Sequence, residues 1–174
     1  MVVAKNDMAH HSLSRQFAEH SIDRAYGAIV WGVPNPVAGT INLPIGRSPK
    51  DRKKMAVRVN GGKSAVTHYR TEQIFAQTVS LVECRLETGR THQIRVHMSH
   101  VGHPLVGDSV YSRAQRRVKR AAIELPLVVH SFARQALHAK LIGFEHPRTL
   151  ERLSFKSDFP SDFKELIDVL DSIK

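Results

Sequence analysis

The sequence has little cysteine, few acidic residues and no long apolar run. Its one cysteine, Cys84, excludes an internal disulfide framework and a multi-cysteine zinc site. Cys84 lies in the apolar run VSLVECRL, which predicts a small buried core residue and not a nucleophile. No stretch of about 18 apolar residues occurs, and MVVAKNDMAHH lacks the features of a signal peptide. We therefore expect neither a membrane partner nor secretion.

The shortage of acid makes this 174-residue chain strongly basic. It has 26 Lys and Arg against 16 Asp and Glu, a formal net charge of +10. Two clusters, GRSPKDRKK (46–54) and SRAQRRVKR (112–120), carry much of this charge, whereas residues 158–174 are acidic. Clustered positive charge is typical of a surface that binds nucleic acid.

The hydrophobic periodicity predicts an α+β fold, with helices flanking a mixed, mostly antiparallel sheet. We expect helices over 6–22, 91–101 and 159–174, and strands over 24–32, 64–75, 78–88 and 135–157, the last range being two strands joined at 146–149. The Pro- and Gly-rich stretch 33–54 predicts a long loop with a short extended piece at TINL.

The first residues, MVVAK, have the pattern of a strand end. This pattern predicts an exposed sheet edge at residues 1–5. Such an edge favours self-association, because its unpaired backbone groups can pair with another chain.

Residues 87–111, ETGRTHQIRVHMSHVGHPLVGDSVY, concentrate Arg and His ahead of a Gly-Asp turn. Four His within twelve residues suggest a metal-dependent hydrolase. However, no acid or Cys joins them at ligand spacing, so we expect no metal. The pattern predicts a helix capped by Thr91 and stopped by Gly102, with one apolar face formed by Ile94, Met98 and Val101.

Two arginines in this stretch suggest contacts with charged groups. Arg90 precedes the predicted helix N-terminus, where free N–H groups favour an anion such as phosphate. Arg95 lies between Ile94 and Val96, so it needs a carboxylate partner to offset its desolvation. No partner is obvious nearby, and an acid elsewhere that only holds the fold remains one interpretation of Arg95.

The run LETGRTHQIRVHMSHVGHPLVGDSVYS resembles the signature of RluA-type pseudouridine synthases, closest to the RluD-like branch acting on large-subunit ribosomal RNA. RAYGAIVWG, AGTINLPIGRSPKDRKKMAV with GKSAVTHYR, and RQALHAKLIGFEHPRT resemble further blocks in the family's order, covering nearly the whole chain. The resemblance implies the family's fold around an RNA-binding cleft. It also implies the family's reaction, in which a flipped uridine loses its base and regains it through carbon 5 without cofactor or metal.

The resemblance implies roles for individual residues. Arg95 would pair with the nucleophilic Asp, and Tyr26 would pack against the flipped base as a candidate proton acceptor. Composition alone would make Tyr26 a cross-strand packing residue. The RNA contacts are expected from the cleft and the two basic clusters, at Arg90, His92, Gln93, Arg47, Arg52, Lys53, Lys54, Arg116 and Arg117.

One departure from the family bears on activity. The nucleophilic Asp belongs to a His-Arg-Leu-Asp motif upstream of the block that MVVAKND matches, and no HRLD occurs in the 174 residues. We do not expect Asp7, which begins a helix, or Asp108, which has a local role in its turn, to replace it. We therefore expect residues 1–174 to be the later part of one catalytic domain, without the S4-like domain that often precedes it, and inactive alone.

The main hypothesis is thus an RNA pseudouridine synthase that isomerises uridine, with large-subunit ribosomal RNA as its partner. The alternative is a non-catalytic RNA-binding protein or rRNA assembly factor that kept the basic cleft. Steeply salt-dependent RNA affinity without isomerisation would indicate the alternative. A reduced, signal-free chain is typical of the bacterial cytoplasm or an organellar matrix.

Overall fold

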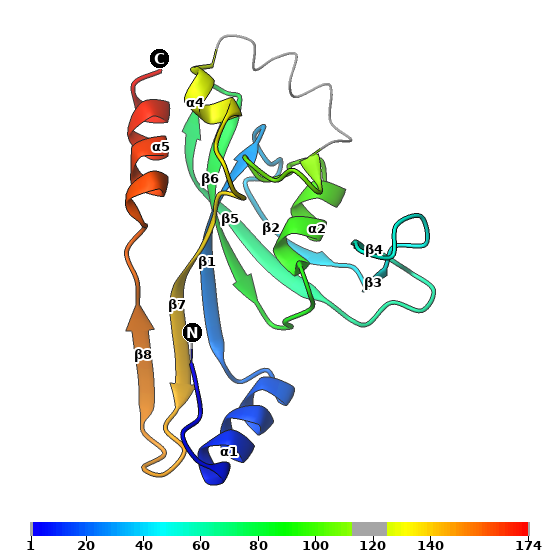
Figure 1. The fold of residues 1–174 in the computed structure, drawn as a ribbon, viewed down its shortest axis with the longest axis vertical. Helices are drawn as coiled ribbons and strands as arrows, with labels where there is room; N and C mark the ends of the chain where they lie inside the picture. The colour runs from blue at the N-terminus through cyan, green and yellow to red at the C-terminus, as the bar shows by residue number, and fades with distance from the viewer. Residues whose placement is uncertain (1, 113–124, 174) are drawn as a thin grey trace.

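A six-stranded sheet in the order β2-β5-β6-β1-β7-β8 organises the chain (Figure 1). The computed structural model describes residues 2–112 and 125–173. Neighbouring strands in this sheet pair antiparallel, as the sequence predicts. The elements are α1 (Asp7–Ala18), β1 (Asp23–Trp31), β2 (Ala38–Asn42), β3 (Ile45–Arg47), β4 (Met55–Val57), β5 (Val66–Phe75), β6 (Val79–Leu86), α2 (Gln93–His100), α4 (Leu127–His130), β7 (Leu137–Glu145), β8 (Arg152–Lys156) and α5 (Ser161–Asp171).

Strand β1 separates two apolar cores, because successive side chains of a strand point to opposite faces. Ala28 and Val30 belong to the core on the α2 side of the sheet. Ile29 and Trp31 belong to the core on the α5 side. Figure 1 shows α2 and α5 on either side of the central strands. Cys84 lies in the α2 core with none of its surface exposed, which confirms its predicted burial.

Helix α1 begins as predicted, but little of its apolar surface is buried. The side chain of Asn6 accepts a hydrogen bond from the Ala9 amide at 2.9 Å, which is the N-cap arrangement. Leu13 is buried, whereas Phe17, one turn further along the helix, is 39% exposed. A helix of this length on the surface buries only a narrow stripe.

The predicted sheet edge at residues 1–5 is wrong for residues 2–5, which form no strand. Val2 and Ala4 pack instead against a small cluster formed by Leu13, Ile22 and Phe144. The edges of the described sheet are β2 and β8. The prediction of self-association through residues 1–5 was based on an unpaired strand edge, and residues 2–5 do not provide one.

The stretch 33–54 is more regular than the predicted loop. Its segment β2 overlaps the extended piece predicted at TINL and pairs with β5 along the sheet edge. The Thr40 hydroxyl lies 2.8 Å from Nδ1 of His68 across the pair. Its segment β3 pairs with β4 in a separate hairpin. The short helix α4 was not predicted either. These elements are short and are flanked by Pro residues, so their own pattern is weak; for β2, pairing with the more distant β5 decides the structure.

The predicted cap of helix α2 is wrong, and helix α5 begins two residues later than its predicted range. Helix α2 begins at Gln93 after His92, which has a left-handed backbone (φ 56°), so Thr91 is not its cap. Helix α5 follows Pro160, which makes no side-chain cap bond, and Asp162 pairs with Arg134. The predicted helix itself is confirmed, and its apolar face packs on the sheet, with Phe163, Leu166 and Leu170 buried and Ile167 beside them.

The other end of α2 agrees better with the sequence. Gly102 has φ 99°, a conformation that favours glycine, and the helix ends before it as predicted. Ile94 and Met98 are buried, but Val101 is 41% exposed, so the predicted apolar face is one turn too long. No helix in residues 2–112 or 125–173 is long and apolar enough to cross a membrane.

Candidate active site

A cavity of about 800 Å³ opens beside β1 and gathers two of the predicted site residues. Tyr26 and Arg24 reach it from β1, on the same face because they are two residues apart. Gly89 and Arg90 reach it from the loop between β6 and α2. The opposite wall is apolar and comes from β7 and β8, with Leu141, Ile142, Phe144 and Phe155. The cavity can therefore take a flat, partly apolar ligand beside cationic groups.

Tyr26 forms part of the cavity wall and also packs within the sheet. It pairs with Cys84 of β6 and Ala139 of β7, and its half-buried ring packs against the α2 core. The two sequence-based interpretations of Tyr26 are thus compatible. The packing holds the ring in place, and the cavity gives it access to a ligand.

Arg24 is a cavity residue that sequence reasoning missed. Its Nη2 donates to the carbonyl oxygens of Glu87 at 2.8 Å and Leu86 at 3.5 Å. A Cβ atom at position 89 would lie 2.5 Å from Arg24 Nη1, so Gly89 leaves the room that the guanidinium occupies. Burial lowers the pKa of Arg24. The sequence held a signal for this role, because Arg24 lies two residues before Tyr26. Residues two apart on a strand point to the same face of the sheet.

The predicted RNA-binding residues Arg90 and Gln93 have different environments. Arg90 lines the cavity, and its Nε donates to the Ser64 carbonyl at 2.9 Å. Gln93 is 3% exposed; its amide oxygen accepts from Thr88 Oγ1 at 2.8 Å and the Arg90 amide at 2.9 Å, and its amide nitrogen donates into β5. Gln93 therefore holds the loop that carries Arg90, and its predicted RNA contact stays a prediction.

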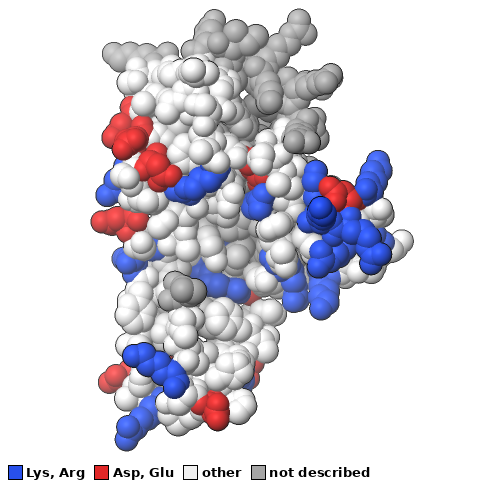
Figure 2. All heavy atoms as spheres, viewed as in Figure 1, with Lys and Arg blue, Asp and Glu red and all other residues white. Residues whose placement is uncertain are grey.

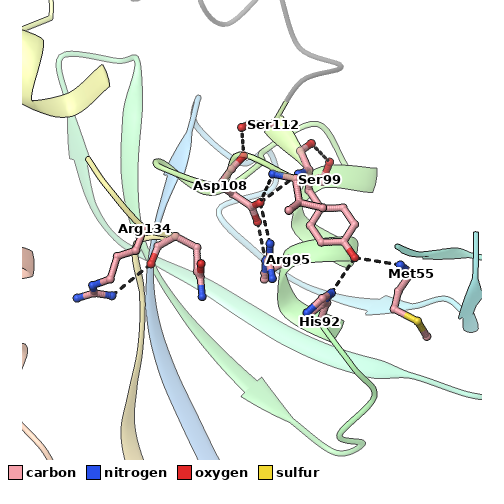
Figure 3. A network of polar contacts seen from close by, with 10 residues as sticks. Met55, His92, Arg95, Ser99, Asp108, Ser112 and Arg134 are labelled. Atoms are coloured by element: carbon pink, nitrogen blue, oxygen red, sulfur yellow. Dashed lines mark hydrogen bonds and ion pairs between the residues drawn. The ribbon is translucent and has the colours of Figure 1, made fainter. Parts of the chain in front are cut away.

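Arg95 and Asp108 form a bidentate ion pair (Figure 3). Arg95 Nε lies 2.7 Å from Asp108 Oδ2, and Arg95 Nη2 lies 2.9 Å from Oδ1. The Asp108 side chain is fully buried and that of Arg95 is 11% exposed. Asp108 Oδ1 also accepts from the amides of Val110 and Tyr111, both at 3.0 Å.

The ion pair supplies the carboxylate partner that was not obvious from the sequence. Burial alone would raise the pKa of Asp108, but the hydrogen bonds from Arg95 and the Tyr111 amide outweigh it and lower this pKa. The same pair raises the pKa of Arg95. Arg95 does not line the Tyr26 cavity within the described residues. In the structure Arg95 thus pairs with an acid that holds the fold, which is one of the interpretations that the sequence left open.

Tyr111 connects this ion pair to the β3–β4 hairpin. Its ring lies under the Arg95 guanidinium, with 4.9 Å between Cζ and the ring centroid. Its hydroxyl accepts from the Met55 amide at 3.0 Å and lies 2.9 Å from Nδ1 of His92. Ser99 Oγ donates to the Tyr111 carbonyl at 2.9 Å. The predicted RNA-binding residue His92 is exposed beside this network and not in the Tyr26 cavity.

The histidines of residues 92–103 do not converge. His97 is fully buried; its Nε2 lies 2.9 Å from the Leu43 carbonyl, so it is the protonated nitrogen, and its Nδ1 accepts from Thr67 Oγ1 at 2.9 Å. His103 Nδ1 lies 3.0 Å from the Trp31 carbonyl. In the part of the chain that the structure describes, no group of three or more His, Cys, Asp or Glu could hold a metal ion.

The β3–β4 hairpin carries the first basic cluster. Figure 2 shows Lys and Arg side chains gathered on this projecting lobe. Arg52 and Lys53 are exposed, Arg47 donates to the Arg52 carbonyl at 3.0 Å, and Lys54 lies 3.7 Å from the Asp51 carboxylate. The second predicted cluster, which includes Arg116 and Arg117, lies outside the described residues.

A model of the RNA pseudouridylate synthase family matches residues 1–100. The chain belongs to this family. Its relatives include the ribosomal large subunit pseudouridine synthases D of Zymomonas mobilis, 48% identical over 98% of this chain, and Pseudomonas aeruginosa, 49% identical over 98%. The uncharacterized RNA pseudouridine synthase YlyB of Bacillus subtilis is 47% identical, also over 98%. The chain spans about half the length of these curated relatives, 52%, 52% and 51%.

Solved structures of the family have the same fold. Human RNA pseudouridylate synthase domain containing 4 superposes with a TM-score of 0.77 at 26% identity, covering 98% of this chain and 70% of that one. Human RNA pseudouridylate synthase domain containing 1 superposes with a TM-score of 0.70 at 28% identity, covering 98% and 74%. The predicted α+β pseudouridine synthase fold is therefore confirmed.

Proposed function

We propose that this chain is the part of an RNA pseudouridine synthase that holds the target uridine and its flanking strand. The convergence of Tyr26, Arg24 and Arg90 on one cavity carries this proposal, in a chain of the pseudouridylate synthase family. The apolar wall opposite Tyr26 suits a base that has left its stack. The two guanidinium groups suit the adjoining phosphates.

The reaction needs no net oxidant or reductant, because it is an isomerisation. The bond between the ribose C1′ and N1 of the base breaks, and a bond from C1′ to C5 forms. The proton on C5 is lost, and N1 takes up a proton. We assign the side-chain oxygen of Tyr26, once it has given up its own proton, as the acceptor of the C5 proton, since Tyr26 lines the cavity.

We do not assign the nucleophilic carboxylate of the reaction to any residue of this sequence. No His-Arg-Leu-Asp motif occurs in the 174 residues. Asp108 is buried and bonded to Arg95, and Asp23, next to Arg24, pairs with Arg152. We propose that these 174 residues bind RNA but do not isomerise uridine until another segment supplies the Asp.

We propose large-subunit ribosomal RNA as the substrate. The relatives from Zymomonas mobilis and Pseudomonas aeruginosa carry this substrate class in their names. The basic β3–β4 hairpin supports binding of a polyanion, because exposed Arg52 and Lys53 have side chains available for phosphate contacts.

Tritium release from large-subunit rRNA labelled at uridine C5 tests the proposal. The chain alone should bind this RNA and release no tritium. A fusion to the part of the Zymomonas mobilis relative that lies outside the similarity should release it. In that fusion Tyr26→Phe should lower release about 100-fold. The matched variant Tyr69→Phe removes a hydroxyl that donates to the Pro36 carbonyl, and it should not lower release.

The outcomes separate the candidate functions. Tritium release by the chain alone would overturn the assignment of the nucleophile to another segment. RNA binding without release from the fusion would favour the alternative, a non-catalytic RNA-binding protein or rRNA assembly factor. In either case Lys53→Ala should reduce the slope of log affinity against log salt by about one if Lys53 contacts phosphate.

A further inference from the structure

A second cavity, of about 560 Å³, lies on the other face of β1. Ala25 lines it, whereas the neighbours Arg24 and Tyr26 line the first cavity, as strand alternation requires. Its remaining walls come from β6, β7, the end of β8 and the first turn of α5. Residues Leu141, Lys156 and Ser157 line both cavities, so the two hollows adjoin at the end of β8.

The lining of the second cavity is cationic. It holds the four basic side chains Arg85, Lys140, Lys156 and Lys164 against the two acidic ones of Glu83 and Asp158. A phosphate oxygen would be attracted by this excess of positive charge.

Two of these basic groups are already neutralised within the protein. The Glu83 side chain, 9% exposed, accepts from Arg85 Nε at 2.8 Å and lies 2.6 Å from Lys140 Nζ. Lys140 also lies 2.9 Å from the Glu72 carboxylate. Among residues 2–112 and 125–173, no carboxylate lies within ion-pair distance of Lys156 or Lys164. These two lysines therefore carry the charge that is available to a ligand.

One wall of the cavity is fixed by close packing. Phe159 lies on the backbone of β1 at Gly27, where a Cβ atom would come 2.4 Å from the ring. The ring also stacks on Phe163, with 4.5 Å between centroids, and meets His138 edge to face at 5.7 Å. Figure 1 shows β8 and α5 in line, joined by a short extended segment. The packing of Phe159 holds this segment against β1, and Lys156 and Lys164, on either side of it, line one hollow.

We propose that the second cavity binds a phosphate of the RNA strand that leaves the Tyr26 cavity, through Lys156 and Lys164. Because Lys156 lines both hollows and β8 is an edge strand, the RNA can pass from one face of the sheet to the other around this edge. This inference rests on the proposed RNA-binding function. It adds a contact surface on the α5 face, away from the β3–β4 hairpin.

The test measures binding of a fluorescent large-subunit rRNA fragment at several salt concentrations. Lys156→Ala and Lys164→Ala should each lower the salt slope by about 0.7–0.9 and the affinity roughly five-fold near 0.1 M salt. Lys164→Arg should keep both values, because the charge is retained. Lys5→Ala is the matched control, since Lys5 is exposed and lines neither cavity. Far-UV circular dichroism checks that each variant folds.

The possible failures are distinguishable. If the unsubstituted chain does not bind the fragment, both the proposed function and this inference are overturned. If it binds, and Lys53→Ala lowers the slope while Lys156→Ala and Lys164→Ala leave it unchanged, only the second phosphate site is overturned. An equal loss in Lys5→Ala would also overturn it, because the effect would then reflect net charge alone.

Discussion

Arg95 donates two hydrogen bonds to Asp108, at 2.7 and 2.9 Å, and joins helix α2 to the turn that follows it. The pair is buried, and two backbone amides complete the coordination of the carboxylate. The positive charge of Arg95 is therefore balanced by a carboxylate of this same chain. A nucleophilic Asp that approached Arg95 would have to share this guanidinium with Asp108.

Asp108→Asn should destabilise the fold by about 3 kcal/mol, because it leaves the mostly buried Arg95 without a charged partner. Urea unfolding measures the loss. The control Asp23→Asn removes the exposed partner of Arg152 and should cost less than about 1 kcal/mol. Equal unfolding free energies for the two variants would contradict a structural role for the buried pair. Arg95→Ala should be similarly destabilising, so its activity has to be judged against its folded fraction.

The stability of the fold should fall as the pH drops below about 6.5, the ordinary pKa of histidine. Burial, and secondarily the charge of His100, lower the pKa of His97 below that value, although its bond to the Leu43 carbonyl opposes the shift. The unfolded chain then binds a proton at position 97 that the folded chain does not, so acidification favours unfolding.

Unfolding free energies measured at about pH 7.5 and about pH 5.5, which lie roughly one pH unit above and below that pKa, test this effect. His97→Gln should reduce the dependence and leave the part that comes from His92, whose pKa burial also lowers. The exposed control His11→Gln should retain the full dependence. A second loss is expected at more acidic pH, where Asp108, whose folded pKa is lowered, takes up its proton. An unchanged slope in His97→Gln would contradict the assignment to His97.

Gly27→Ala should destabilise the fold by about 1–3 kcal/mol, because the new methyl group overlaps the Phe159 ring. Gly46→Ala, whose Cβ would have neighbours no nearer than 3.4 Å, is the control and should cost less. In a Phe159→Ala background the cost of Gly27→Ala should shrink, since the clash is removed. Thermal unfolding of the four proteins gives the coupling. Strict additivity would contradict the contact.

Cys84 should not react with a thiol reagent in the folded protein. Burial, with a smaller effect of the Glu83 charge, raises its pKa to about 12, so thiolate is scarce at neutral pH. Mixing with the reagent in guanidinium chloride should release the full thiol signal. Rapid labelling of the folded chain would show that the α2 core opens locally.

The fold was predictable where a segment carries its own pattern. The paired strands β5 and β6, the amphipathic helix α5 and the Asn6 cap follow from residues close in sequence, and the order of motifs identified the family. The extended piece predicted at TINL lies in strand β2, but the pairing of β2 with β5 was not predictable in this way, because β5 is distant in the sequence and β2 has little alternation. The start of α2 was missed because a non-glycine residue, His92, takes the left-handed conformation there.

The same distinction between local sequence and tertiary contacts applies to the residues of the candidate site. The sequence alone determined the basic charge, the Arg- and His-rich stretch, and the candidate roles of Tyr26 and Arg90. Only the tertiary structure decided that Arg24 joins them, that Gln93 is occupied by backbone contacts, and that Asp108 is the partner of Arg95. The physical reason is that residue type limits which interactions a side chain can make, whereas burial and distance between remote segments select the ones it does make.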